Sequence, residues 1–133
     1  MLSLKLSWRH LSIDDPTWDQ VVQAIEASKK NGFNVTIYNN AAGDPGVDSI
    51  VLEIDEDTGI FQPVLLMNPI GMRVFENING SEELIEFNGS DTVSGIVTDD
   101  MATVLRLAKE FYETGDVKEM KGWDELFFNI KKD

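Results

Sequence analysis

Residues 98–115 read TDDMATVLRLAKEFYETG, and this stretch carries the clearest structural signal in the chain. Its apolar side chains recur at intervals of three and four residues, which is the spacing of one face of an α-helix. Thr98 or Asp99 would cap the N-terminus, and Gly115 would end the helix in a left-handed conformation. The stretch therefore predicts an amphipathic helix whose apolar positions are Met101, Val104, Leu105, Ala108, Phe111 and Tyr112.

A second helix is predicted over residues 16–31. Asp14-Asp15-Pro16 is typical of a helix start, because Asp accepts free amide hydrogens and Pro is harmless in the first turn. Apolar residues follow at helical spacing. Asn31-Gly32 supplies the left-handed stop.

Outside these helices, apolar and polar residues alternate with the period of a β-strand. The predicted strands comprise residues 2–8, a second from Phe33 through Ile37, a third from Ile50 to Ile54, a fourth starting at Ile60 and Phe61, a fifth from Met72 to Glu76 and a sixth from Leu84 to Phe87. Val93 to Val97 is either a short seventh strand or an extended lead-in to the helix. Predicted turns lie at residues 56–59, Asn79-Gly80 and Asn88-Gly89, and predicted loops at residues 9–14 and 39–46.

These elements predict a single domain over residues 1–133, without repeats or linkers. The expected class is α+β, a largely antiparallel sheet of about six strands with two main helices packed on it. A meander is the simplest topology. Pro63 suggests that the fourth strand is an edge strand or contains a bulge, since Pro cannot donate to the ladder.

The chain has 24 acidic residues against 11 lysines and arginines, a formal net charge of −13 at pH 7. Such a surface repels phosphate, so nucleic acid is not an expected partner, and a basic protein is the natural complement. Excess carboxylate also keeps a small protein soluble, so charge alone does not identify a partner.

The absence of cysteine and the single histidine exclude most familiar catalytic chemistry. Disulfides, thiolate nucleophiles, Cys-ligated metals and Cys–His pairs are impossible within one chain. His10 is interpreted as a surface-loop residue, because no nucleophile is predicted beside it. The N-terminal strand alternates instead of offering an unbroken apolar run, so we expect no signal peptide, no membrane contact and a cytoplasmic location.

Residues 55–59 resemble the start of a calcium loop, but Leu66 occupies the position where a bidentate Glu is needed. The segment is better interpreted as an acidic hairpin turn. The glycines at 43 and 46 lack the Lys-Ser/Thr of a phosphate loop. We therefore expect no metal and no cofactor.

Acidic side chains on elements expected to be rigid are the best candidate binding residues. They form two groups, one at the first hairpin and one along the sixth strand: Glu53, Asp55, Glu56 and Asp57, and Glu82, Glu83 and Glu86. A third mixture of charge and aromatic anchors lies near the end of the second helix. It combines Glu110, Glu113, Asp116 and Glu119 with Phe111 and Tyr112, which core packing and solvation would also explain.

The C-terminal third resembles small immunity proteins of bacterial polymorphic toxin and contact-dependent growth inhibition (CdiI-like) systems. The resemblance rests on residues 97–101, on the helix that ends in residues 109–117, and on Trp123. In that group an acidic cap leads into a helix that closes on Phe-x-x-x-Gly, here Phe111 to Gly115, with a tryptophan shortly after. The N-terminal part is similar in layout.

The resemblance implies a non-enzymatic cytosolic protein that binds and blocks the toxic C-terminal domain of an effector, commonly a nuclease or a nucleic-acid deaminase. It supplies no catalytic residues. Carboxylates on the inhibitor would take the place of phosphate in a basic cleft. Replacing Glu82, Glu83 and Glu86 with Lys is predicted to slow association without unfolding the domain, because exposed carboxylates contribute little to stability.

Two other classes of function remain open from the sequence. One is a small metabolite-binding domain or minor enzyme, with a pocket lined by Trp8, Trp18 and Tyr38 and a lone carboxylate. The other is a chaperone-like or structural module. A metabolite that raises the thermal midpoint would favour the first, whereas capture of a basic polypeptide would favour inhibition. The sequence makes no prediction about self-association.

Overall fold

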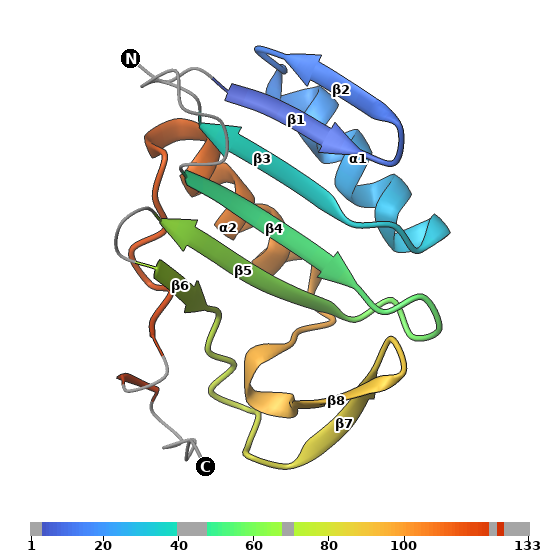
Figure 1. Ribbon diagram of the computed structural model, residues 1–133, viewed down its shortest axis with the longest axis vertical. Helices are drawn as coiled ribbons and strands as arrows, with labels where there is room; N and C mark the ends of the chain where they lie inside the picture. The colour runs from blue at the N-terminus through green and yellow to red at the C-terminus, as the bar shows by residue number, and fades with distance from the viewer. Residues whose placement is uncertain (1–3, 40–47, 68–70, 123–124, 127–133) are drawn as a thin grey trace.

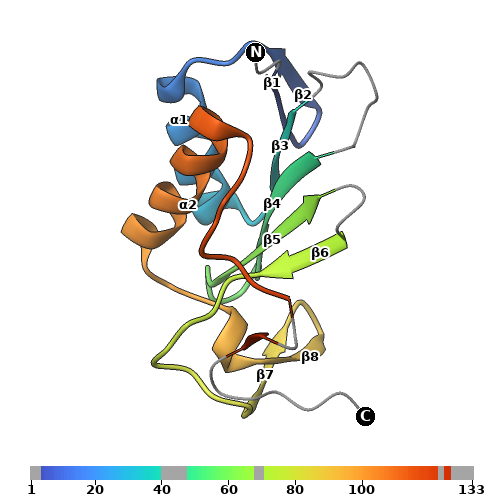
Figure 2. The ribbon, with the colours of Figure 1, turned by 90° about the vertical axis from the view of Figure 1, so that its left-hand side faces the viewer.

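The computed structural model describes residues 4–39, 48–67, 71–122 and 125–126. It has two layers, an antiparallel sheet and a pair of helices that cover one of its faces (Figures 1 and 2). The strands of the sheet are β1 Leu4–Trp8, β2 Leu11–Asp14, β3 Val35–Asn39, β4 Asp48–Ile54, β5 Phe61–Met67 and β6 Gly71–Val74. The helices are α1 Trp18–Asn31 and α2 Met101–Thr114. The predicted α+β class, with a six-stranded antiparallel sheet and two main helices, is confirmed.

The strand order is β2-β1-β3-β4-β5-β6. The predicted meander therefore holds from β3 to β6, but β2 folds back on the outer side of β1 and makes that end of the sheet. Residues 11–14 lie in the segment predicted as a loop, so that prediction is wrong. The turn between β1 and β2 is Arg9-His10, with Arg9 at a φ of 52°, and it lacks the Asn or Gly that marks a hairpin in a sequence.

Both helices end where the sequence predicts, and both begin slightly later. Gly32 and Gly115 adopt left-handed conformations as C-caps. α1 is capped by Thr17 in a capping box with Gln20, instead of by the preceding aspartates. The cap of α2 is Asp100, and neither Thr98 nor Asp99 takes that role.

The main core fills the space between the sheet and the helices. Alternate residues of β1, β3, β4 and β5 point into it and meet the apolar faces of α1 and α2. The largest fully buried side chains are Phe61, Phe111, Leu6, Ile25, Ile37, Ile50, Leu52, Ile54, Leu65, Leu107, Met120 and Val21. Both helices of the described residues lie on this one face of the sheet (Figure 2).

Pro63 lies in an interior strand, so its prediction as an edge or bulge residue is wrong. β5 pairs with β4 in unbroken register and with β6 on its other side. The backbone of Phe61 faces away from β4 and exchanges hydrogen bonds with Thr98, and by alternation the nitrogen of Pro63 faces that same side. On that side Pro63 lies opposite Phe75, which is one residue beyond the end of β6. The missing N–H of Pro63 therefore removes no hydrogen bond between β5 and β6.

The predicted sixth strand is not part of the main sheet. Residues Leu84–Phe87 form β7, which pairs with β8, Ser90–Val93, in a separate two-stranded sheet. A 3₁₀ turn, η1, follows at Ser94–Ile96, where the sequence suggests a seventh strand or an extended segment. A second apolar cluster underlies this hairpin and consists of Val74, Phe87, Ile96, Val97 and Leu126.

Some predictions lie outside the described residues. They concern the beginning of the first strand, the loop at 40–46, and the tail residues Trp123, Phe127 and Ile130. In the part of the chain that the structure describes, no helix combines the length and the apolar character needed to cross a membrane.

Candidate interaction surface

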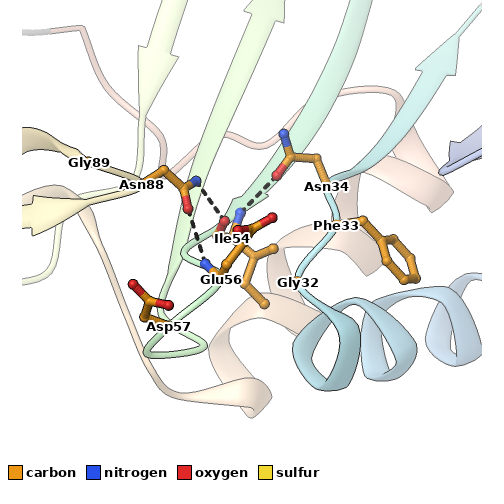
Figure 3. A pocket seen from close by; sticks show the side chains of 8 residues that line it. All are labelled: Gly32, Phe33, Asn34, Ile54, Glu56, Asp57, Asn88 and Gly89. Carbon is orange, nitrogen blue, oxygen red and sulfur yellow. Dashed lines mark hydrogen bonds between the residues drawn. The ribbon is translucent and has the colours of Figure 1, made fainter.

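The structure brings the tip of the β7–β8 hairpin against the turn between β4 and β5. Figure 1 shows the two turns side by side at one end of the sheet, and Figure 3 shows the contact. Both turns follow from local sequence. Residues 56–59 close the β4–β5 hairpin, with Gly59 at a φ of 73°, and Asn88-Gly89 has φ values of 50° and 82°, as a type I′ turn requires. The predicted turns at 56–59 and 88–89 are confirmed. At the third, Asn79-Gly80, the chain turns at residues 78–79, and neither Asn79 nor Gly80 has a positive φ.

Asn88 joins the two turns through its side chain and its backbone. Its Nδ2 donates to the carbonyl of Ile54 at 2.8 Å, and its Oδ1 accepts from the backbone N–H of Glu56 at 3.0 Å (Figure 3). Its own backbone N–H donates to Oδ1 of Asp55 at 2.7 Å. A side chain from one hairpin thus satisfies backbone groups of the other.

Asp55 is part of the scaffold beneath this contact. Its side chain is buried, and its second oxygen accepts from the N–H and the hydroxyl of Thr58 at 3.0 and 2.6 Å. The Thr58 hydroxyl and then the Asn88 N–H hold the pKa of Asp55 below its ordinary value of 3.8, against the opposing effect of burial. With both oxygens occupied, Asp55 does not present a carboxylate to a partner, although the sequence places it among the candidate contact residues.

The other acidic residues of the first hairpin reach the surface. Glu56 and Asp57 are exposed and line a hollow of about 410 Å³, together with Asn88, Gly89 and residues 32–34 (Figure 3). Glu53 is half-buried on β4 and lines a neighbouring hollow of about 300 Å³ on the other side of Asn88. Burial raises the pKa of Glu53 above 4.5.

The second predicted group is only partly in this region. Glu86 lies on β7, two residues before Asn88, and is exposed. Glu82 and Glu83 are also exposed, but they precede β7 at the end of the hairpin away from the turn. The structure therefore separates them from the first group by the length of a strand.

Asp91 is a further acidic residue that the sequence analysis missed. It pairs directly with Glu86 across the hairpin, and it lines the same hollow as Glu53. The signal was present in the sequence, because a two-residue turn at 88–89 places residue 91 opposite residue 86. We call the carboxylates around the two turns the turn surface; they are Glu53, Glu56, Asp57, Glu86 and Asp91.

The turn surface lacks internal neutralisation. Among the described residues, none of its five carboxylates forms an ion pair, and no Lys or Arg lines either hollow. Glu86 and Asp91 are like charges in directly opposite positions, which costs stability in an antiparallel pair. The region thus concentrates negative charge that the fold does not use.

The acidic residues near the end of α2 differ in this respect. Asp116 pairs with Arg73 at 2.5 Å, and Glu119 pairs with Arg106. Glu110 accepts the backbone N–H of Lys118 at 2.8 Å. These three carboxylates have partners within the molecule, and Glu113 is exposed.

The aromatic residues of the same region belong to the packing of the domain. Phe111 is fully buried in the main core. Tyr112 packs on Trp18 and donates its hydroxyl to the carbonyl of Pro16 at 2.8 Å. The aromatic anchors predicted there are therefore not available at the surface as a binding patch.

The predicted aromatic pocket is not assembled. Trp8 stacks on Phe33 with ring centroids 5.1 Å apart, whereas Trp18 packs on Tyr112 between the helices. Tyr38 alternates with the core residue Ile37 on β3 and so faces the opposite side of the sheet. The three side chains do not line one cavity.

No protein-family model matches this sequence, and no curated protein and no solved structure is significantly similar to it. Within the described residues, no group of three or more acidic or histidine side chains is arranged to hold a metal ion.

Proposed function

We propose that this protein is an immunity protein that binds a basic toxin domain and blocks it by occupying its substrate-binding surface. The proposal combines the resemblance of residues 97–101, 109–117 and Trp123 to CdiI-like immunity proteins with the chemistry of the turn surface. The observation that carries it is the concentration of unpaired carboxylates around two docked turns, on a chain of net charge −13.

The turn surface suits a cationic partner for two physical reasons. A lysine or arginine placed between Glu86 and Asp91 would relieve their mutual repulsion, and one near Glu53 would favour its charged form. The free energy that the isolated fold loses to these charges would be recovered on binding. Long-range attraction would also accelerate capture of the toxin.

Inhibition of this kind needs no bond-making by the inhibitor. A nuclease or nucleic-acid deaminase binds a polyanion in a basic cleft, and the carboxylates of the turn surface would take the place of phosphates there. A stable complex would bury on the order of 1,600 Å², with the turns as its acidic part. Because the toxin acts inside the cell, the proposal places this protein in the cytoplasm.

The direct test starts from the reading frame immediately upstream of this gene, where the proposal expects a secreted protein that ends in a basic domain. That domain is coexpressed with this protein. Cells that express the domain alone should die, and cells that also express this protein should grow. Failure of the wild-type protein to protect, together with failure of the purified chains to associate, would reject the function.

A charge-reversal variant tests the surface. Glu56→Lys, Asp57→Lys and Glu86→Lys together should lower the association rate about tenfold or more at low salt, because steering depends on local potential. The matched control replaces three exposed carboxylates elsewhere, Glu26, Glu113 and Glu125, with Lys and changes the net charge equally. If both variants slow association to the same extent, net charge alone acts and the turn surface has no special role.

A further inference from the structure

The β7–β8 hairpin, which carries Glu86 and Asp91 of the turn surface, is braced at its base. The segment before β7 packs so closely on η1 that a Cβ on Gly80 would lie 2.6 Å from the Cα of Gly95. Asn77 donates its backbone N–H to Gly95 at 2.7 Å and its side-chain amide to Val97 at 3.0 Å. Residues 77–97 therefore form one compact unit.

Hydrogen bonds connect this unit to the main sheet at the middle of β8 and at the tip of the hairpin. Thr92 donates to the side chain of Gln62 on β5 at 3.0 Å, midway along β8. At the tip, the contacts are those of Asn88 with residues 54–56. Apolar contacts beneath the unit, through Phe87 and Ile96, are non-directional, so they do not by themselves fix the hydrogen-bond geometry at the tip.

Asn88 has two properties suited to fixing the tip. Its φ of 50° is one that Asn tolerates better than other residues with a Cβ. In that conformation its amide both donates to one turn residue and accepts from another, which defines direction as well as distance. Glycine would keep the backbone conformation and remove only the amide.

We propose that Asn88 is the positioning residue of the turn surface: it sets the distance between the carboxylates of the β4–β5 turn and those of the β7–β8 hairpin. In this proposal Asn88 does not itself supply the binding energy. It positions Glu56 and Glu86, which contact the partner. This inference rests on the proposed function. If it is correct, the uncharged Asn88 should affect the rate at which the complex with the basic partner dissociates.

The test uses Asn88→Gly. The control is Asn79→Gly, at an asparagine that is also exposed and also precedes a glycine but does not have a positive φ. In the free protein, hydrogen exchange at the backbone amide of Glu56 should accelerate about tenfold in Asn88→Gly, because that amide loses its acceptor, the side-chain oxygen of Asn88. Exchange at Ile37 and Leu65 in the core should not change.

The probe is the basic domain against which this protein protects cells in the coexpression test. Asn88→Gly should raise its dissociation rate about tenfold and leave its association rate within about twofold, since net charge is unchanged. A merely structural role would alter both rates or neither. Faster exchange with an unchanged dissociation rate would overturn the positioning role and leave the proposed function intact. Absence of binding by the wild-type chain would overturn both, and the exchange data would then describe a structural clamp.

Discussion

Asp55 is a charged residue that serves the fold. Both of its oxygens accept from donors, namely the N–H of Asn88 and the N–H and hydroxyl of Thr58. Asparagine has the same shape but only one acceptor oxygen, so its NH₂ would face a donor. Asp55 therefore stabilises the fold, whereas its neighbours Glu56 and Asp57 are exposed to solvent.

Asp55→Asn should lower the thermal midpoint at pH 7 more than Glu56→Gln does, because a buried donor loses its acceptor. The pKa of Asp55 is lower in the folded than in the unfolded chain, so its contribution is complete above the ordinary value of 3.8 and is lost as the pH falls through the lower, folded value. The difference in thermal midpoint between Asp55→Asn and the wild type should therefore become smaller below about pH 4. The thermal midpoints are measured by circular dichroism at several pH values between neutral and acidic. An Asp55→Asn protein as stable as the wild type at pH 7 would contradict the assignment.

Glu53 should behave in the opposite way. Burial raises its folded pKa above 4.5, so the folded state binds the proton more readily, and stability declines as the pH rises from about 4.5 through the folded pKa. Glu53→Gln should raise the thermal midpoint at pH 7 and leave it unchanged near pH 4. Glu26→Gln on the exposed side of α1 is the control and should have no such effect. If the basic partner interacts with Glu53 as proposed, the stabilised variant should also bind it more weakly.

At the scale of elements, the β7–β8 hairpin is where prediction and structure differ most. Alternation in residues 84–87 indicated a strand correctly, and Asn88-Gly89 indicated its turn. Neither pattern specifies which strand is the neighbour, because pairing depends on contacts between distant segments. The close approach of Gly80 and Gly95 joins the two ends of the hairpin unit, and no local sequence pattern indicates such an approach.

Gly80→Ala should therefore destabilise the hairpin unit. A methyl group at this position meets backbone atoms, Gly95 Cα at 2.6 Å and Ser94 O at 2.7 Å, which cannot rotate away. The expected loss is about 1–3 kcal/mol of unfolding free energy, as for overpacked sites. Urea denaturation measures it. Gly122→Ala, where an added Cβ meets nothing within 4 Å, should be close to neutral. If Gly80→Ala and Gly122→Ala had the same free energy of unfolding, the base of the β7–β8 hairpin would not be tightly packed.

At the scale of the whole molecule, the distribution of charge matters more than its total. Near the end of α2, Asp116 and Glu119 pair with arginines, whereas among the described residues no carboxylate of the turn surface forms an ion pair. The negative potential should thus be stronger at the turn surface than near the end of α2. This asymmetry gives a basic partner a preferred direction of approach.

Association with the basic domain should consequently depend strongly on salt. Raising the ionic strength from about 0.01 M to about 0.5 M should slow association roughly tenfold or more, because the Debye length falls below the width of the surface. Stopped-flow fluorescence at several salt concentrations provides the rates. The Glu56→Lys, Asp57→Lys, Glu86→Lys protein should show a weaker dependence than the matched control. A rate independent of salt would show that steering plays no part in the encounter.

The sequence by itself determined the features that depend on neighbours along the chain. These are the helical period of residues 101–112, the left-handed glycines at 32 and 115, the acidic turn at 56–59, and the excess of carboxylates. Such features follow from backbone geometry and side-chain spacing within a few residues, and so they can be predicted from one sequence.

Only the tertiary structure decided which acidic residues belong together. It placed Asp55 under the surface, Glu82 and Glu83 away from it, and Asp91 within it. It also gave Asn88 its three partners, which are more than thirty residues distant in the chain. The physical reason is that burial and hydrogen bonding between remote segments depend on how the hairpins dock, and docking is settled by packing of the whole domain.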